Sequence, residues 1–232
     1  WNDLDMVFLS LPNGEAQKII NKTFNKYKKL KYIDLSADFR IKDSKKYYLN
    51  YQIKHKSPKL IKYSRYSISE FNTKNLHKYR IIANPGCYPT SILIPMVPLI
   101  KKNYIKVNQI TIDAKSGFSG AGKNLEKKFK HKNLYSSIYA YNIINHRHVC
   151  EIEQEFLKIS KKITFNFIPH LLPTFRGILS SIYVNTKNNS ANKIRNTLLE
   201  YYKRSKFVKV LKLNSELGSG NVLNSNYCEI SV

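Results

Sequence analysis

The chain of 232 residues is long enough for one large domain or two small ones, and its 42% of hydrophobic residues argues against a disordered protein. Its net charge of +25 comes mostly from lysine rather than arginine, so we interpret it as a solvated surface and expect no nucleic-acid partner. The three scattered cysteines argue against a disulfide framework or a zinc site, and no apolar run is long enough to cross a membrane.

The first third of the chain alternates strand and helix patterns. Residues 6–11 are a short apolar run typical of a buried parallel strand, and the Pro12-Asn13-Gly14 turn ends it. A helix is expected at 15–24 and further strands at 32–35 and 80–83. This order predicts part of a doubly wound parallel sheet of the Rossmann type.

Residues 40–80 are rich in Tyr, Lys and Ser and only weakly periodic, so we expect a loop-rich excursion there. The glycine-rich turn G-x-G-x-x-G, which opens a dinucleotide fold, is not found in the sequence. We therefore expect the sequence to be partial and to begin within a Rossmann domain.

The remainder of the chain is dominated by strand patterns. These predict a second, α+β domain with a mainly antiparallel sheet. We place the boundary so that residues 1–86 form the first domain and 87–232 the second. The expected elements are strands at 105–114, 163–168, 177–184, 207–213 and 227–232, and a helix at 191–203 with Ser190 as its cap.

Cys87 lies in a setting that suits a nucleophile. The run Ala83-Asn84-Pro85-Gly86-Cys87-Tyr88-Pro89-Thr90 ends a strand, turns at Pro-Gly and begins a helix, with Pro89 suited to its first turn. A helix N-terminus favours a thiolate, which is the reactive form of cysteine. The alternative is a small buried hydrophobe, and we assign that packing role to Cys150 and Cys228.

Two further segments carry polar chemistry. Residues 116–123 hold three glycines, which allow backbone N–H groups to approach an anion, but taken alone a plain flexible loop is the better explanation of them. In an extended stretch His146 and His148 share one face and Arg147 takes the other. Histidine suits general acid–base work near neutrality, and arginine suits a carboxylate or phosphate. Asp34, Asp38 and Arg40 are interpreted as a structural turn.

Five segments occur together in one order. The sequence resembles the N-acetyl-γ-glutamyl-phosphate reductase family, and the resemblance covers essentially the whole chain. The segments that carry it are Ile33-Asp34-Leu35-Ser36-Ala37-Asp38-Phe39-Arg40, Asn84-Pro85-Gly86-Cys87-Tyr88-Pro89-Thr90, Ser116-Gly117-Phe118-Ser119-Gly120-Ala121-Gly122-Lys123, His146-Arg147-His148 with Glu151-Ile152, and Pro169-His170-Leu171-Leu172-Pro173 with Arg176-Gly177-Ile178-Leu179.

The resemblance implies a fold, an activity and a set of site residues. Residues 1–86 would be a partial NADP-binding domain, and 87–232 a catalytic and dimerisation domain. The implied activity is that of an NADP-dependent oxidoreductase, in which NADPH reduces N-acetyl-γ-glutamyl phosphate through a thioester on cysteine, in arginine biosynthesis. A homo-oligomer, dimer or tetramer, in the cytoplasm or an organelle stroma is expected, without membrane or metal. The implied site residues are Cys87 and His146 for catalysis; Asn84, Arg147, His148 and Arg176 for substrate; and Pro12, Asn13, Gly117, Ser119, Gly120, Ala121 and Gly122 for cofactor.

The sequence also departs from the family. Besides the glycine-rich turn, the segment that returns to the cofactor domain at the C-terminus is not found, and the sequence leaves open whether His146 or His148 is the acid–base group. Three other readings stay open: an aminoadipate or aspartate-semialdehyde type of reductase, an inactive remnant, and a lysine-rich RNA-binding protein.

Overall fold

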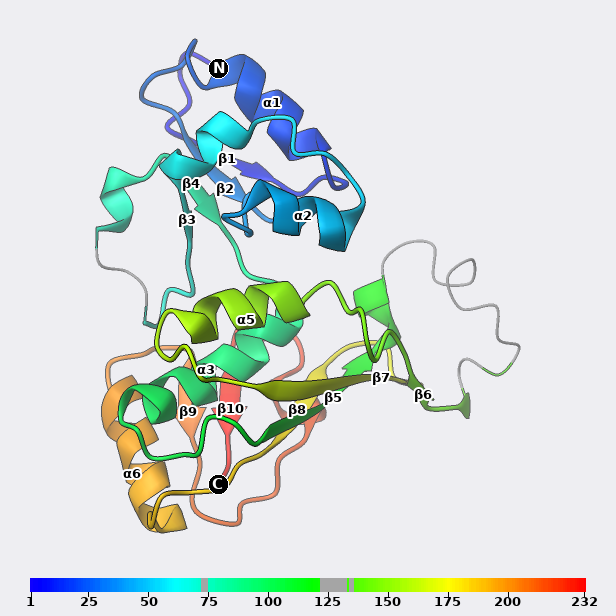
Figure 1. Ribbon diagram of the computed structural model, residues 1–232, viewed down its shortest axis with the longest axis vertical. Helices are drawn as coiled ribbons and strands as arrows, with labels where there is room; N and C mark the ends of the chain where they lie inside the picture. Colours follow the sequence, from blue (N-terminus) through cyan, green and yellow to red (C-terminus); the bar gives the residue numbers. More distant parts are fainter. Residues whose placement is uncertain (72–74, 122–132, 134–135) are drawn as a thin grey trace. The chain divides into compact units, whose positions relative to one another are not determined.

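The computed structural model describes residues 1–71, 75–121, 133 and 136–232, and the chain divides into two compact units, 1–86 and 87–232 (Figure 1). In the described residues, no helix is long and apolar enough to cross a membrane.

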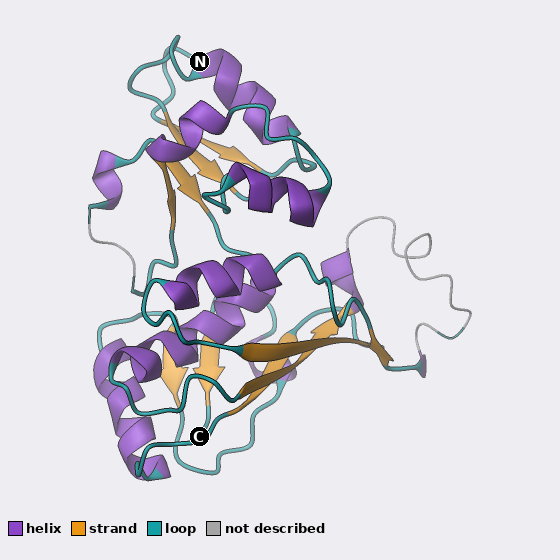
Figure 2. Ribbon diagram, in the orientation of Figure 1, coloured by secondary structure: helices purple, strands orange, loops and turns teal. Residues whose placement is uncertain are grey.

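The first unit is built on a four-stranded sheet in which all neighbouring strands are parallel. Its strands are β1 (Met6–Leu9), β2 (Lys31–Asp34), β3 (Ser64–Tyr66) and β4 (Ile81–Ala83), in the order β1-β2-β4-β3. The three strands expected from the sequence are therefore confirmed as neighbours, and the helix α1 (Glu15–Thr23) follows β1 as expected. Figure 2 shows this unit as a strand layer flanked by helices.

The expectation of a loop-rich excursion at residues 40–80 is wrong. That stretch contains α2 (Ser44–Tyr51), 3-10 turns at Pro58–Tyr63 and Leu76–Lys78, and the edge strand β3. The helix α2 begins where the Asp43 side chain accepts hydrogen bonds from the backbone N–H groups of Lys45 (2.8 Å) and Lys46 (3.3 Å). These elements are short and lack a clear apolar period, which is why the pattern did not reveal them.

The core of the first unit lies between α1 and the sheet. Ile20, Tyr32 and Ile81 are completely buried, and Leu9 and Phe24 are nearly so. Burying one large apolar side chain contributes about 1.5–3 kcal/mol relative to leaving it exposed. This small cluster therefore holds the helix against the strands.

The second unit is built on a mixed sheet in the order β6-β7-β5-β8. Its strands are β5 (Ile110–Gly117), β6 (Tyr139–Ala140), β7 (Phe165–Leu172) and β8 (Ile178–Tyr183). The outer pairings, β6 with β7 and β5 with β8, are antiparallel, whereas the central pair of β5 and β7 is parallel over eight residues. The α+β character is confirmed, and the sheet is mixed around a parallel centre.

The described part of this unit also contains three α-helices and a second pair of strands. The helices are α3 (Cys87–Lys101), α5 (Val149–Leu157) and α6 (Ala191–Tyr202), and α3 packs against β8, α5 and α6. The expected cap of α6 is confirmed, because the Ser190 hydroxyl accepts a hydrogen bond from the Lys193 N–H at 3.3 Å. The strands β9 (Val208–Val210) and β10 (Cys228–Ile230) form a parallel pair, and 3-10 turns occupy Phe118–Ala121 and Ser219–Val222.

Gly117, at the end of β5, is required by a close approach of backbone. A Cβ atom at this position would lie 2.8 Å from the Arg176 nitrogen and from the carbonyl oxygens of Thr174 and Phe175. Gly177 in the same turn has φ +114°, and a Cβ there would lie 2.6 Å from the Ser219 Cβ. Glycine is therefore needed at both positions for the turn after β7 to pack on the end of β5.

Replacing Gly117 by alanine is expected to destabilise the second unit by about 1–3 kcal/mol, because backbone atoms cannot move aside as a flexible side chain can. Urea unfolding followed by circular dichroism measures this loss. Gly220→Ala is the matched control, since nothing lies within 4 Å of a Cβ at that position. Equal stability of the two variants would contradict the packing explanation.

Candidate functional site

The turn from β4 into α3 places Cys87 at the surface. Three residues, 84–86, separate the end of β4 from α3, and Cys87 is the first residue of that helix. The Cys87 side chain is exposed, whereas the next two residues, Tyr88 and Pro89, are buried. The helix therefore begins with its cysteine outside the core and its aromatic ring inside it.

Asn84 is held in this turn by hydrogen bonds to its backbone. Its N–H donates to the Asp34 carbonyl at 2.8 Å, and its carbonyl accepts from the Arg40 Nε at 2.7 Å. The Asn84 side chain is exposed and donates to the Pro85 carbonyl at 3.2 Å. The sequence placed Asn84 in the substrate site, and the structure leaves its amide at the surface.

The segment between β2 and α2 acts as a structural turn. The buried Asp34 carboxylate accepts hydrogen bonds from the Ser36 N–H, the Ser36 hydroxyl and the Phe39 N–H, at 2.6–3.1 Å. Burial raises the pKa of Asp34 to about 6, although these hydrogen bonds oppose the rise. Arg40 also donates to the Leu35 carbonyl at 3.0 Å. This arrangement agrees with the structural interpretation of these residues.

Asp38 closes the N-terminus of α1. Its carboxylate accepts from the N–H groups of Gly14 (2.7 Å) and Gln17 (3.1 Å) and from the Tyr47 hydroxyl (2.8 Å). A helix N-terminus is a common site for phosphate, but here the chain's own carboxylate takes those two donors. The neighbouring Pro12 is exposed and Asn13 is half-buried, so any contact of theirs with a cofactor would lie beside this helix end.

The His146-Arg147-His148 segment has the predicted alternation. His146 and His148 are each only 5% exposed, whereas Arg147 is exposed. The His146 Nδ1 atom accepts a hydrogen bond from the His148 N–H at 3.2 Å, and the His148 Nε2 atom lies 3.8 Å from a carboxylate oxygen of the fully buried Glu151. Burial first, and the Arg147 charge second, lower the pKa of His146 to about 4.

Tyr88 brings the start of α3 together with both histidines. Its ring centroid lies 5.5 Å from that of His146 and 5.9 Å from that of His148, in edge-on geometry. Burial raises the pKa of Tyr88 and of Tyr141, and in both cases the Cys87 charge adds to the rise. The sulfur is therefore electrostatically coupled to the two tyrosines beside His146.

The glycine-rich segment packs against the turn that carries Arg176. The N–H groups of Gly117, Phe118 and Ser119 each donate at 2.9 Å to carbonyls within residues 174–177. These donors are therefore used inside the chain rather than left for an anion. Ser119 and Gly120 are exposed, the backbone of Ala121 ends a 3-10 turn, and Gly122 lies outside the described residues.

Arg176 is exposed, and its guanidinium carbon lies 5.2 Å from the centroid of the Phe175 ring. The structure thus gathers His146, His148 and the tyrosine next to Cys87 in one cluster. It places Arg147 and Arg176 at the surface of the same unit.

Comparison with known proteins decides the family. Residues 87–232 match the family model described as "Semialdehyde dehydrogenase, dimerisation domain". The N-acetyl-γ-glutamyl-phosphate reductase of Alkaliphilus metalliredigens is 42% identical over 99% of this chain, and that of Ehrlichia canis is 41% identical over 99%. The chain belongs to the N-acetyl-γ-glutamyl-phosphate reductase family. It spans 66% of the length of each of these two relatives.

A plant relative is similar to this chain in sequence, and two solved structures are similar to it in fold. A probable chloroplastic N-acetyl-γ-glutamyl-phosphate reductase of Arabidopsis thaliana is 40% identical over the whole of this chain and 58% of its own length. An aspartate semialdehyde dehydrogenase II from Vibrio cholerae has a TM-score of 0.69 at 14% identity, covering 100% of this chain and 70% of its own. The Candida albicans enzyme, crystallised with NADP, has a TM-score of 0.62 at 14% identity, covering 99% and 68%. At such identities these structures show a shared fold.

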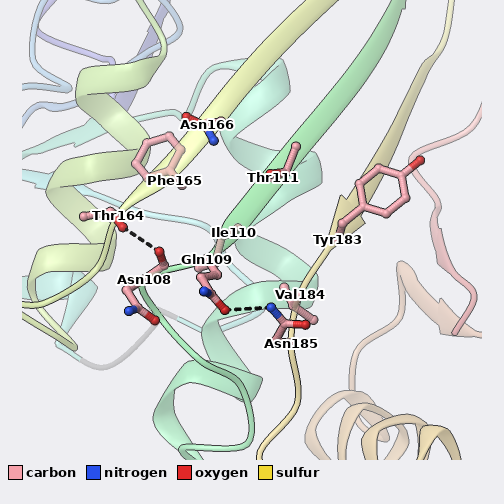
Figure 3. Close-up of a pocket in the computed structure, with 10 residues that line it drawn as sticks. All are labelled: Asn108, Gln109, Ile110, Thr111, Thr164, Phe165, Asn166, Tyr183, Val184 and Asn185. Carbon is pink, nitrogen blue, oxygen red and sulfur yellow. Dashed lines mark hydrogen bonds between the residues drawn. The ribbon is translucent and has the colours of Figure 1, made fainter.

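A hollow of about 500 Å³ lies elsewhere in this reductase-family chain. It is lined at the first residues of β5 and β7 and at the end of β8, by residues that include Gln109, Phe165 and Asn185 (Figure 3). The Asn185 amide donates to the Gln109 side chain at 2.7 Å, and the Thr164 hydroxyl donates to the Asn108 carbonyl at 3.0 Å. Among the described residues that line the hollow there is neither Cys87 nor a histidine, so the hollow is separate from the histidine cluster.

The sequence did not reveal several members of the family's candidate site. Tyr88 lies in the cysteine motif and Glu151 follows the histidines, but the sequence pattern indicates no role for either residue. Tyr141 and Phe167 carried no signal, because their contacts join segments that are distant in the chain. The whole set becomes visible only when α3, β7 and the histidine segment are folded together.

The burial of His146 predicts a pH dependence of stability. Its pKa is about 4 in the folded chain, against 6.5 for an ordinary histidine, so the unfolded chain binds more protons between these values. Stability contributed by the neutral ring is therefore complete above pH 6.5 and is lost as the pH falls toward 4, by on the order of 3 kcal/mol. The raised pKa of Asp34 acts in the opposite direction in the first unit.

Hydrogen exchange of the β5 amides is measured against pH in the unsubstituted protein and in His146→Gln. Because both proteins contain Asp34, the difference between the two pH profiles reports the effect of His146. We expect protection in the unsubstituted protein to fall more steeply between pH 6.5 and 4. Parallel slopes would show that His146 is not buried in its neutral form.

Proposed function

We propose that this chain carries the acyl-transfer and proton-transfer residues of a reductase that converts N-acetyl-γ-glutamyl phosphate to N-acetylglutamate 5-semialdehyde and phosphate, with NADPH as reductant, in arginine biosynthesis. The observation that carries the proposal is the exposed Cys87 at the first residue of α3, with Tyr88 packed against two buried histidines. The names of relatives near 40% identity support the substrate.

Cys87 is the proposed acyl acceptor. Its thiolate attacks the acyl carbon, a C–S bond forms, and the C–O bond to phosphate breaks, so phosphate leaves with the electron pair. The product is a thioester on Cys87. Covalent capture divides one difficult step into two easier ones, and the helix N-terminus favours the thiolate.

Contacts with the cofactor are proposed in each unit by itself. The carboxyl ends of parallel strands form the usual ligand edge of such a sheet, and Pro12 and Asn13 follow β1 at that edge. The exposed Pro12, Ser119 and Gly120, with Asn13, Gly117, Ala121 and Gly122, are the residues we propose to contact NADPH. When bound, NADPH supplies the hydride that reduces the acyl carbon.

His146 is the proposed proton donor. Because its Nδ1 accepts the His148 N–H, the proton of the neutral ring lies on Nε2. That N–H donates to the oxygen that gains negative charge when the thioester is reduced. When the C–S bond breaks, the proton returns to the ring, the aldehyde leaves, and Cys87 is again a thiolate. His148, beside Glu151, is the alternative donor.

The cationic and amide side chains at the surface complete the proposed substrate site. Arg147 and Arg176 are exposed guanidinium groups, which suit bidentate binding of the phosphate and of the substrate carboxylate. Asn84 offers an exposed amide next to the cysteine turn, and His148 lies beside His146.

A homo-oligomer, dimer or tetramer, is part of the proposal. Its support is the family model described as a dimerisation domain, which matches the whole second unit. Light scattering of the purified chain tests it, and a monomeric mass at micromolar concentration would contradict it.

The activity is tested in a chimera in which this chain replaces the matching segment of the Alkaliphilus metalliredigens relative. The chimera is expected to form NADPH from the semialdehyde, NADP⁺ and phosphate. Cys87→Ser is expected to abolish turnover, since a serine hydroxyl is hardly ionised near neutrality. His146→Ala is expected to lower kcat by about 10² to 10⁴.

Cys228→Ser is the matched control, because this cysteine lies in β10, outside the cluster, and its loss should leave turnover unchanged. A Cys87→Ser chimera that keeps a substantial part of the activity would refute the role of Cys87.

A further inference from the structure

The His146 imidazole is enclosed by aromatic rings from three parts of the chain. The centroids of Tyr88, Tyr141, Phe167 and His148 lie 5.5, 5.5, 5.3 and 4.9 Å from its own. The first three meet it edge-on, with interplanar angles of 70–82°. We call Tyr88, Tyr141 and Phe167 the aromatic box. Aromatic rings prefer such edge-on contacts, so the three rings together favour one orientation of the His146 imidazole.

Hydrogen bonds anchor the box to β7. The Tyr141 hydroxyl donates to the Tyr88 hydroxyl at 3.3 Å, and the Tyr88 hydroxyl donates to the His170 carbonyl at 3.2 Å. The Tyr141 N–H also donates to the Pro169 carbonyl at 3.1 Å. Both tyrosines are therefore held by a hydroxyl or a backbone group, and neither ring can turn away without breaking one of these hydrogen bonds.

We propose that Tyr88 and Tyr141 are positioning residues, which hold His146 as an uncharged ring whose Nε2–H is the only proton it can offer. The proposal rests on the proposed role of His146 as proton donor and explains how that donor is oriented. Two geometric facts support it: the box excludes water from the ring, and the His148 N–H occupies Nδ1. A proton donor that is held in place avoids reorganisation when the charge develops.

The groups that face His146 are few among the described residues. From α3 comes Tyr88, from the segment after β6 comes Tyr141, and from its own segment come Arg147 and His148. The β7 residue against it, Phe167, is uncharged. Arg147 carries a full positive charge next to His146. Burial, which is the larger cause, and this charge together lower the pKa of His146 to about 4.

Nuclear magnetic resonance of ¹⁵N-labelled histidine tests the box without any cofactor. In the unsubstituted chain we expect the His146 signals of an Nε2–H tautomer that stays neutral down to about pH 5. Tyr141→Leu removes a wall of the box and admits water, so the pKa of His146 should rise by at least one unit and the tautomers should mix. Tyr141→Phe keeps the ring, so the pKa should stay within a few tenths.

Tyr104→Leu is the matched control, because Tyr104 lies beneath Lys193 of α6 and outside the box. It should leave the His146 signals unchanged. If Tyr141→Leu does not fold, Tyr141→Met fills more of the volume but lacks the flat ring, and the same rise is expected.

Turnover of the chimera separates this proposal from the proposed function. Tyr141→Leu should lower kcat by about 10- to 100-fold with little change in KM, and Tyr141→Phe should recover most of it. Unchanged His146 signals in Tyr141→Leu would overturn the box, whatever the activity. Altered signals with full turnover would overturn His146 as the proton donor, and the positioning role with it.

Discussion

Hydrogen bonds to the main chain fix the residues on both sides of Cys87. Before it, the Asn84 N–H is bonded to the Asp34 carbonyl, and the Asn84 carbonyl to Arg40. After it, Tyr88 donates to the His170 carbonyl. The first set belongs to the first unit and the last bond to the second. The residues before and after Cys87 are thus each held within their own unit, and the Cys87 side chain is exposed.

Buried polar groups serve this arrangement in two different ways. In the first unit, carboxylates shape the backbone: Asp34 holds the turn that positions Arg40, and Asp38 closes α1. In the second unit, the buried polar groups include the imidazoles of His146 and His148, and aromatic rings contact both of them. Burial raises the pKa of Asp34 and lowers the pKa of His146, so in both cases the uncharged form is favoured. In the proposed reaction, His146 donates its proton from that neutral form.

The sequence predicted features that depend on neighbouring residues. The strands around β1, β2 and β4 and the cap at Ser190 follow from local patterns. The family was also visible, because its segments are short and contiguous in the chain.

Features that depend on distant contacts could not be predicted. The parallel pairing of β5 with β7 joins strands between which β6 and α5 lie in the chain, and no local pattern states the direction of pairing. Asp38 reaches back to Gly14 across 24 positions, and Tyr141 reaches Tyr88 across 53. The requirement for glycine at position 117 could not be predicted either, because the backbone that approaches it belongs to residues 174–176, which are distant in the chain. The same residue looked like part of an anion-binding loop.

The most direct measurement is the mass of the intact chain after exposure to N-acetyl-γ-glutamyl phosphate, since acyl transfer to the thiol requires no reductant. The account expects one added acyl group, located by peptide mapping on Cys87, removed by hydroxylamine and not formed in Cys87→Ser. Release of phosphate should match the adduct in amount. Acylation confined to Cys228 or to lysines, or an equal adduct in Cys87→Ser, would contradict the central claim that Cys87 is the acyl acceptor.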